Sequence, residues 1–167
     1  MSFIIEDGTG VAGATSYATV AQAQAYATDR GLSLPAAEAD VQKLLIKACD
    51  FLQSLEDQYQ GSRTDAEQAL AWPRSGVTVF GTQLVADDAI PSMLVQAQCQ
   101  LAFDSVANEL LPVGSGREVL SETVGPLSVS YSASGASTVK PIPTKALSIL
   151  QPLMRSGGSM GLRTLRV

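Results

Sequence analysis

Apolar residues recur at steps of three and four positions along much of the chain, the spacing that places them on one face of a helix. The strongest run predicts a helix over 35–59, which Gly61 ends. Its apolar positions are Val41, Leu44, Leu45, Ala48, Leu52, Leu55 and Tyr59. Similar spacing predicts helices over 17–30, 91–110 and 144–154, and Ser16 or Thr19 is the expected N-cap of the first.

Two stretches instead favour strands. The run 77–85 predicts a small hairpin around Gly81, and 117–133 predicts two extended pieces that Gly125-Pro126 separates. In the second piece, Leu127, Val129 and Tyr131 alternate with serines, which is typical of a half-exposed strand. The expected fold is therefore mainly α: a small bundle of about four helices, with one or two β-hairpin excursions and an extended basic C-terminal tail.

The pattern predicts three parts along the chain. Residues 1–16 form an N-terminal arm, and 17–154 form a helical domain with its β excursion at about 117–133. Residues 155–167 form a glycine-rich, basic tail. No apolar run approaches the roughly 18 residues of a membrane span, and the N-terminus lacks the features of a signal peptide. Cys49 and Cys99 are expected to be buried free thiols, which fits a reduced, intracellular setting.

Charge is distributed unevenly around a net value of −5. Every acidic residue lies at or before Glu122: residues 1–122 carry sixteen acids and six bases, a net of −10. Residues 123–167 carry five bases and no acid, a net of +5. A basic tail on an acidic body predicts that the tail meets an acidic surface on another copy or on a partner.

Gly8, Gly10 and Gly13 match the G-x-G-x-x-G pattern of dinucleotide-binding loops. That site also needs a second parallel strand ending in an acid about 20 residues later, and here a second helix stands in that place. We therefore interpret the glycines as the hinge of a flexible arm. The short extended run at residues 3–5 is expected to pair with a neighbouring strand, such as the one over 127–131.

Catalytic chemistry has little support in the sequence. The absence of histidine removes the commonest general base and the commonest metal ligand. No serine, threonine or lysine is marked by its spacing as part of a nucleophile–base pair. Three adjacent acidic pairs are weak metal candidates: Glu6–Asp7, Glu56–Asp57 and Asp87–Asp88. We expect no enzyme activity, no cofactor and no metal site.

Single-stranded nucleic-acid binding needs a basic groove with exposed aromatic side chains. Here the body is acidic and only 5% of residues are Phe, Trp or Tyr. The single tryptophan, Trp72, lies in an apolar context, so we expect it to anchor the irregular 62–90 segment, with Pro73 fixing the exit of the chain. Arg74 is expected to pair with an acid, either in the same subunit or in a neighbouring one. The basic tail could contact phosphates, but it contains no aromatic residue.

Several stretches carry a family resemblance that spans about residues 3–155. They are Ile5–Val11, Ser16-Tyr17, Tyr26, Asp29–Gly31, Asp65–Val77, Val124–Leu127 and Ala146–Leu153, and the most specific motif is Ala71-Trp72-Pro73-Arg74-Ser75-Gly76. The chain resembles a tailed-phage family of head-to-tail connector (adaptor) proteins. Members often carry the label of DnaT-like single-stranded DNA-binding protein. The acidic body and scarce aromatics favour the connector function over that label.

The resemblance implies a structural virion protein, a bacteriophage neck component that forms a ring, a dodecamer by analogy, and lines the DNA channel. Its implied partners are the portal protein, a tail-side neck or tail-completion protein, and passing double-stranded DNA, with no membrane. The implied location is the virion, with the host cytoplasm during assembly. The alternative function is a single-stranded DNA-binding replication protein.

Two sets of residues follow as candidates. The tail is expected to dock on the portal through Arg155, Met160, Leu162, Arg163, Leu165, Arg166 and Val167. The motif residues expected to be structural are Trp72, Pro73, Arg74 and Gly76.

Overall fold

A computed structural model of the chain describes residues 2–110, 121–124, 127–130 and 143–155. The chain divides into two units. One unit contains residues 1–110 and 143–167, and the other contains residues 111–142. The first unit carries the helices, and the second carries one hairpin. The mainly α class predicted from the sequence is confirmed, while residues 156–167 of the predicted tail lie outside the described residues.

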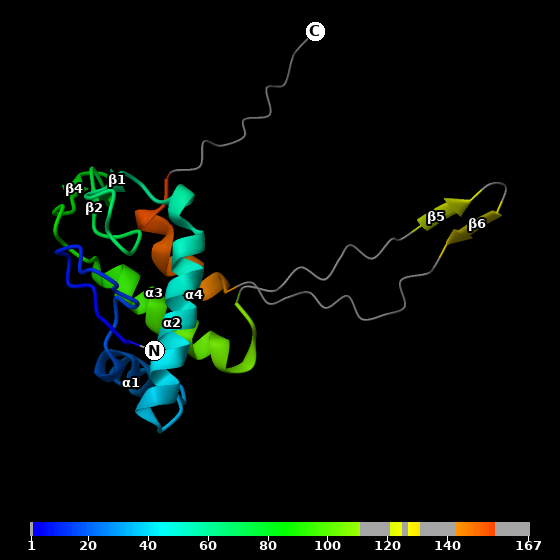
Figure 1. Ribbon diagram of the computed structural model, residues 1–167, viewed down its shortest axis with the longest axis horizontal. Helices are drawn as coiled ribbons and strands as arrows, with labels where there is room; N and C mark the ends of the chain where they lie inside the picture. Colours follow the sequence, from blue (N-terminus) through cyan, green and yellow to red (C-terminus); the bar gives the residue numbers. More distant parts are fainter. Residues whose placement is uncertain (1, 111–120, 125–126, 131–142, 156–167) are drawn as a thin grey trace, which may run out of the picture. The chain divides into compact units, whose positions relative to one another are not determined.

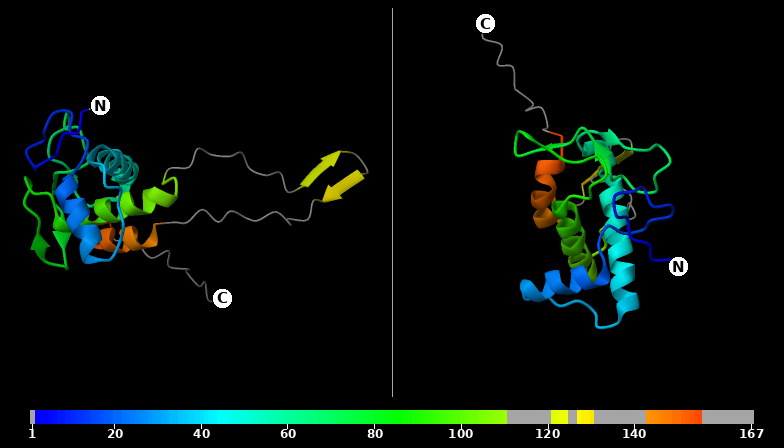
Figure 2. Two further views of the ribbon diagram at one scale, coloured as in Figure 1. Left: turned by 90° about the horizontal axis from the view of Figure 1, so that it is seen from below. Right: turned by 90° about the vertical axis from the view of Figure 1, so that its left-hand side faces the viewer.

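The first unit is built around four helices (Figure 1). They are α1 (Val20–Asp29), α2 (Glu38–Ser54), α3 (Ser92–Ala107) and α4 (Thr144–Leu150). Helix α3 contacts each of the other three. Figure 2 shows α2 and α4 on either side of α3, with α1 crossing one end of the group. Within the described residues, no helix has both the length and the apolar character needed to cross a membrane.

Short 3-10 turns and strands gather at the opposite end of the helices (Figure 1). The 3-10 turns are η1 (Glu56–Gln58) and η2 (Gln151–Leu153). The antiparallel pairs are β1 (Ser62–Arg63) with β2 (Arg74–Ser75), and β3 (Thr78–Val79) with β4 (Gln83–Leu84). The hairpin expected over 77–85 is therefore present, whereas the β1–β2 pair was not predicted.

The second unit contains the antiparallel hairpin of β5 (Ser121–Val124) and β6 (Leu127–Ser130). Its register pairs Ser121 with Ser130 and Val124 with Leu127. These strands correspond to the two extended pieces expected over 117–133. Gly125-Pro126, expected to separate them, lies outside the described residues.

Gln98 of α3 ties three parts of the first unit together. Its Oε1 accepts hydrogen bonds from the backbone N–H groups of Tyr17 and Ala18, each at 2.9 Å. Its Nε2 donates to Ser16 Oγ and to the carbonyl of Leu45 in α2, each at 2.9 Å. The side chain is fully buried, and both of its donors and both acceptor positions are used.

This network explains where α1 begins. Residues 16–18 are held by Gln98, so the helix starts at Val20 and not at 17 as the pattern predicted. Thr19 is the N-cap: its side chain accepts from the N–H of Gln22 at 3.1 Å, while the Gln22 side chain accepts from the N–H of Thr19 at 2.8 Å. This capping box decides between the two expected caps in favour of Thr19.

Helix α2 ends earlier than predicted because Tyr59 has a different role. The chain leaves the helix after Ser54, and Tyr59 pairs with Met154 in an isolated antiparallel bridge. The Tyr59 ring is fully buried and its hydroxyl donates to the carbonyl of Leu52 at 3.1 Å. Cys49 and Cys99 are buried free thiols, as predicted, and burial raises their pKa values to about 12 and about 11.

Candidate nucleic-acid interface

The glycine-rich loop near the N-terminus surrounds a carboxylate of its own chain. The buried Glu6 side chain accepts hydrogen bonds from the N–H groups of Gly8 and Gly10 at 2.9 Å and of Val11 at 2.8 Å. In a dinucleotide site such amides would face a pyrophosphate. Here an internal anion already occupies them, so the loop has no free amide cradle for a phosphate.

The same loop is packed against the body. Gly8 has φ +108, and a Cβ at this position would lie 1.9 Å from the carbonyl oxygen of Asp88. Ile5 forms a parallel bridge with Ser16 of its own segment. Gly8 therefore permits a close backbone approach to Asp88, whereas Gly10 and Gly13 have positive φ values without such an approach.

Trp72 lies in the core, at a distance from any surface where bases could stack. Its side chain is fully buried and packs edge-to-face on Tyr59, with ring centroids 5.6 Å apart. The Trp72–Pro73 peptide bond is cis. Trp72 Nε1 has no hydrogen-bond acceptor within the described part of the chain.

Arg74 is also buried, and its guanidinium joins two stretches of backbone. It donates to the carbonyls of Gln60 (2.8 Å), Gly61 (3.0 Å) and Ala71 (3.2 Å). Glu56 Oε1 lies 3.7 Å from its NH1 atom, so the acid is within the same chain. Burial lowers the pKa of Arg74, and the Glu56 charge opposes that shift. Gly76, the last motif residue, has φ +74 and follows β2.

Glu56 is shared by two arginines. Arg63 makes a bidentate contact, with its Nε and NH2 each 2.6 Å from a different Glu56 oxygen. Hydrogen bonding by Arg63 lowers the pKa of Glu56 despite its partial burial. Across the described residues, no three Cys, Asp or Glu side chains group closely enough to hold a metal ion.

A groove of about 650 Å³ lies between the β3–β4 turn and η2. Phe80 stands at this turn with 73% of its surface exposed, and its φ of +50 is the left-handed conformation. Among the described residues it is the one exposed aromatic side chain. The groove is lined by Gln60, Thr78, Phe80, Gly81, Gln151, Pro152, Met154 and Arg155.

Gln60 holds the two walls of this groove together. Its Nε2 donates to the carbonyls of Pro152 (2.9 Å) and Met154 (3.0 Å), and its Oε1 accepts from the N–H of Thr78 at 3.3 Å. The Gln60 N–H also donates to the Leu153 carbonyl at 3.0 Å. These hydrogen bonds, of which the three from the Gln60 side chain are half-buried, set the spacing between the β3–β4 hairpin and η2 before any ligand binds.

The charge of the groove differs from that of the body. Residues 2–110 and 143–155 contain fourteen acids and seven bases. Four of these bases, Lys43, Lys47, Arg63 and Arg74, lie within 4 Å of a carboxylate. In this part of the chain Arg155 has no carboxylate within that distance, and no acid lines its groove.

The sequence predicted the hairpin and the basic tail separately, and it did not place Phe80 and Arg155 on one groove. An apolar aromatic next to a turn glycine, Phe80-Gly81, is the one local signal that could have indicated exposure. Of the expected tail residues, Arg155 lines the groove. The others, Met160, Leu162, Arg163, Leu165, Arg166 and Val167, lie outside the described residues.

Comparison with known families gives one match. The family model described as "Putative DnaT-like ssDNA binding protein" matches residues 1–167. No curated protein and no solved structure matches the chain.

This match overturns the connector prediction. The expected head-to-tail adaptor, its ring of copies, and its portal and neck partners with passing double-stranded DNA are wrong, because the matching family is one of single-stranded DNA-binding proteins. The error came from averaging charge and aromatic content over the whole chain. Such averages do not reveal one exposed aromatic side chain, Phe80, on a groove that is lined by Arg155 and by no acid. The virion location stays a prediction.

Proposed function

We propose, since the chain belongs to the DnaT-like single-stranded DNA-binding family, that it binds single-stranded DNA in the groove between the β3–β4 turn and η2. The observation that carries this proposal is the pairing of exposed Phe80 with Arg155 on a groove without acidic side chains. The protein acts by binding and not by catalysis.

Phe80 supplies the stacking surface. Every base has an aromatic face, so stacking on a phenyl ring works for any sequence. In a duplex both faces of a base are covered by its neighbours, and a base can reach Phe80 only when it is unpaired. Stacking therefore supports a preference for single strands over duplex.

Arg155 supplies the phosphate contact. It is followed in sequence by Arg163 and Arg166, and no acid occurs after Glu122. The rest of the first unit has an excess of acids, which repels a phosphate backbone. The DNA strand is therefore attracted to the end of the molecule where Arg155 lies.

Phe80→Ala tests the stacking contact. We expect it to weaken binding to an oligo-dT strand about tenfold, since a base–aromatic stack contributes about 1–3 kcal/mol. The measurement is fluorescence anisotropy of a labelled strand titrated with the full chain. Leu84→Ala is the matched control, because Leu84 is 71% exposed on the same hairpin and does not line the groove. Equal affinities for Phe80→Ala and the wild type would show that the strand does not stack on this hairpin.

Arg155→Ala tests the electrostatic contact in the same assay. Removing one phosphate contact should reduce the slope of log K against log salt concentration by about 0.7. The Lys145→Ala variant removes an exposed cation that does not line the groove, so its slope should match that of the wild type. An unchanged slope for Arg155→Ala would rule out the proposed phosphate contact.

A further inference from the structure

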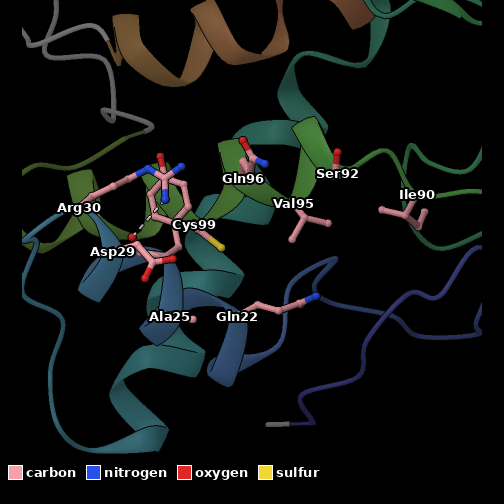
Figure 3. Close-up of a pocket in the computed structure, with 10 residues that line it drawn as sticks. Gln22, Ala25, Asp29, Arg30, Ile90, Ser92, Val95, Gln96 and Cys99 are labelled. Carbon is pink, nitrogen blue, oxygen red and sulfur yellow. Dashed lines mark hydrogen bonds between the residues drawn. The ribbon is translucent and has the colours of Figure 1, made fainter. Parts of the chain in front are cut away.

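A second pocket, of about 540 Å³, lies between α1 and α3 (Figure 3). It shares no lining residue with the groove between the β3–β4 turn and η2. Its volume falls in the usual range for small-molecule sites. Gln22, Asp29 and Arg30 come from α1 and its end, whereas Ser92 and Gln96 come from α3 on the facing wall (Figure 3). Ala25, Val95 and Cys99 add apolar surface between these walls.

The planar, positively charged guanidinium group of Arg30 lines this pocket. Its guanidinium carbon lies 3.7 Å from the centroid of the Tyr26 ring, and its NH1 donates to the Tyr26 carbonyl at 3.4 Å. Tyr26 is itself fixed, because its hydroxyl donates to Gln100 Oε1 at 3.1 Å. The ring covers one face of the guanidinium, and Arg30 is an exposed residue. Guanidinium planes of this kind stack on nucleobases.

The polar side chains around the Arg30 guanidinium have unused hydrogen-bonding capacity. Asp29, Ser92 and Gln96 make no side-chain hydrogen bond to other described residues. Gln22 uses its Oε1 in the α1 capping box, which leaves its Nε2 without a protein acceptor among those residues. The pocket therefore offers a carboxylate, two amides and a hydroxyl near a stacking surface.

We propose that this pocket binds a guanine base. The Asp29 carboxylate only accepts hydrogen bonds, and guanine is the base that presents two adjacent donors, N1–H and N2–H, on its Watson–Crick edge. Adenine and cytosine would place a ring-nitrogen lone pair against that carboxylate, and thymine would place carbonyl oxygens beside its single donor. Because Asp29 offsets the charge of Arg30, the site favours a neutral base over a bare phosphate.

This inference goes beyond the single-strand groove, because other elements build the pocket. Guanine could come from a free nucleotide or from a base in a DNA strand. The proposal concerns recognition of guanine itself. Titrations with free nucleotides and with oligonucleotides distinguish the two sources.

The test compares dGMP with dIMP, which lacks only the N2 amino group, by isothermal titration of the full chain. We expect dGMP to bind about tenfold more tightly, the effect of one hydrogen bond to a charged group. Asp29→Asn should bring the ratio close to one, whereas Asp57→Asn, an exposed acid that does not line the pocket, should leave it unchanged. Arg30→Ala should weaken both nucleotides about tenfold, and its circular dichroism melt shows whether the fold is retained. Equal binding of dGMP and dIMP by the wild type, or an unchanged ratio in Asp29→Asn, would overturn the proposal.

Two oligonucleotides then identify the source of the base. If a strand supplies it, an oligo-dT carrying one central dG binds more tightly than all-dT in the wild type but not in Asp29→Asn. If a free nucleotide supplies it, the two strands bind equally while the dGMP preference remains. Both outcomes support guanine recognition. Weaker all-dT binding in Phe80→Ala with the dGMP preference intact would show that groove and pocket are separate sites.

Discussion

Arg74→Ala lowers the free energy of unfolding by about 3–5 kcal/mol. The substitution removes a buried cation and leaves Glu56 with one arginine in place of two. It also removes the donors to the carbonyls of the adjacent residues Gln60 and Gly61 and of Ala71, which lies in a second stretch of backbone. Chemical denaturation monitored by far-ultraviolet circular dichroism measures the loss.

Arg63→Ala is the matched control for this prediction. Both arginines contact Glu56, but the Arg63 side chain is 31% exposed and that of Arg74 is 5% exposed. Water can solvate the groups that Arg63 leaves, so Arg63→Ala should lower the free energy of unfolding by about 1 kcal/mol or less. Similar losses in the two variants would show that burial of Arg74 does not set the stability of the 56–76 region.

Gln98→Leu lowers the free energy of unfolding by at least about 3 kcal/mol. Leucine has a similar volume, so the change removes hydrogen bonds without opening a large cavity. It leaves the N–H group of Tyr17 buried with no acceptor and that of Ala18 with Ser16 Oγ alone, at 3.2 Å. It also removes the donor to Ser16 Oγ and to the Leu45 carbonyl, and each buried group left unpaired costs about 1–3 kcal/mol.

The control for Gln98→Leu is Gln96→Leu, two positions away on the same helix and exposed. We expect its unfolding free energy to stay within about 0.5 kcal/mol of the wild type. If Gln98→Leu has an equally small effect, the buried amide does not hold residues 16–18 against α2 and α3.

The helices were the most predictable part of the fold, because their apolar spacing is local. What the pattern missed depends on contacts between distant residues. The first helix begins at Val20 because Gln98, about 80 positions away, holds residues 16–18. The second helix ends at Ser54 because Tyr59 pairs with Met154. A window of neighbouring residues contains neither contact.

The candidate site was less predictable than the fold. The glycine pattern matched a nucleotide-binding loop, yet three of its amides face Glu6, a residue two positions before the first glycine. The acidic net charge was correct, but it concealed the cation at Arg155 and the exposed aromatic at Phe80. These two residues are 75 positions apart, and only the folded chain places them on one groove.

The most direct test of single-strand binding uses Phe80→Trp. The natural tryptophan, Trp72, is fully buried, so the substitution adds a solvent-exposed fluorophore at the proposed stacking position. Titration with oligo-dT should quench the added emission to saturation, with much weaker quenching by the same length of duplex. The account is contradicted if oligo-dT causes no quenching, or if duplex quenches the emission as strongly as the single strand.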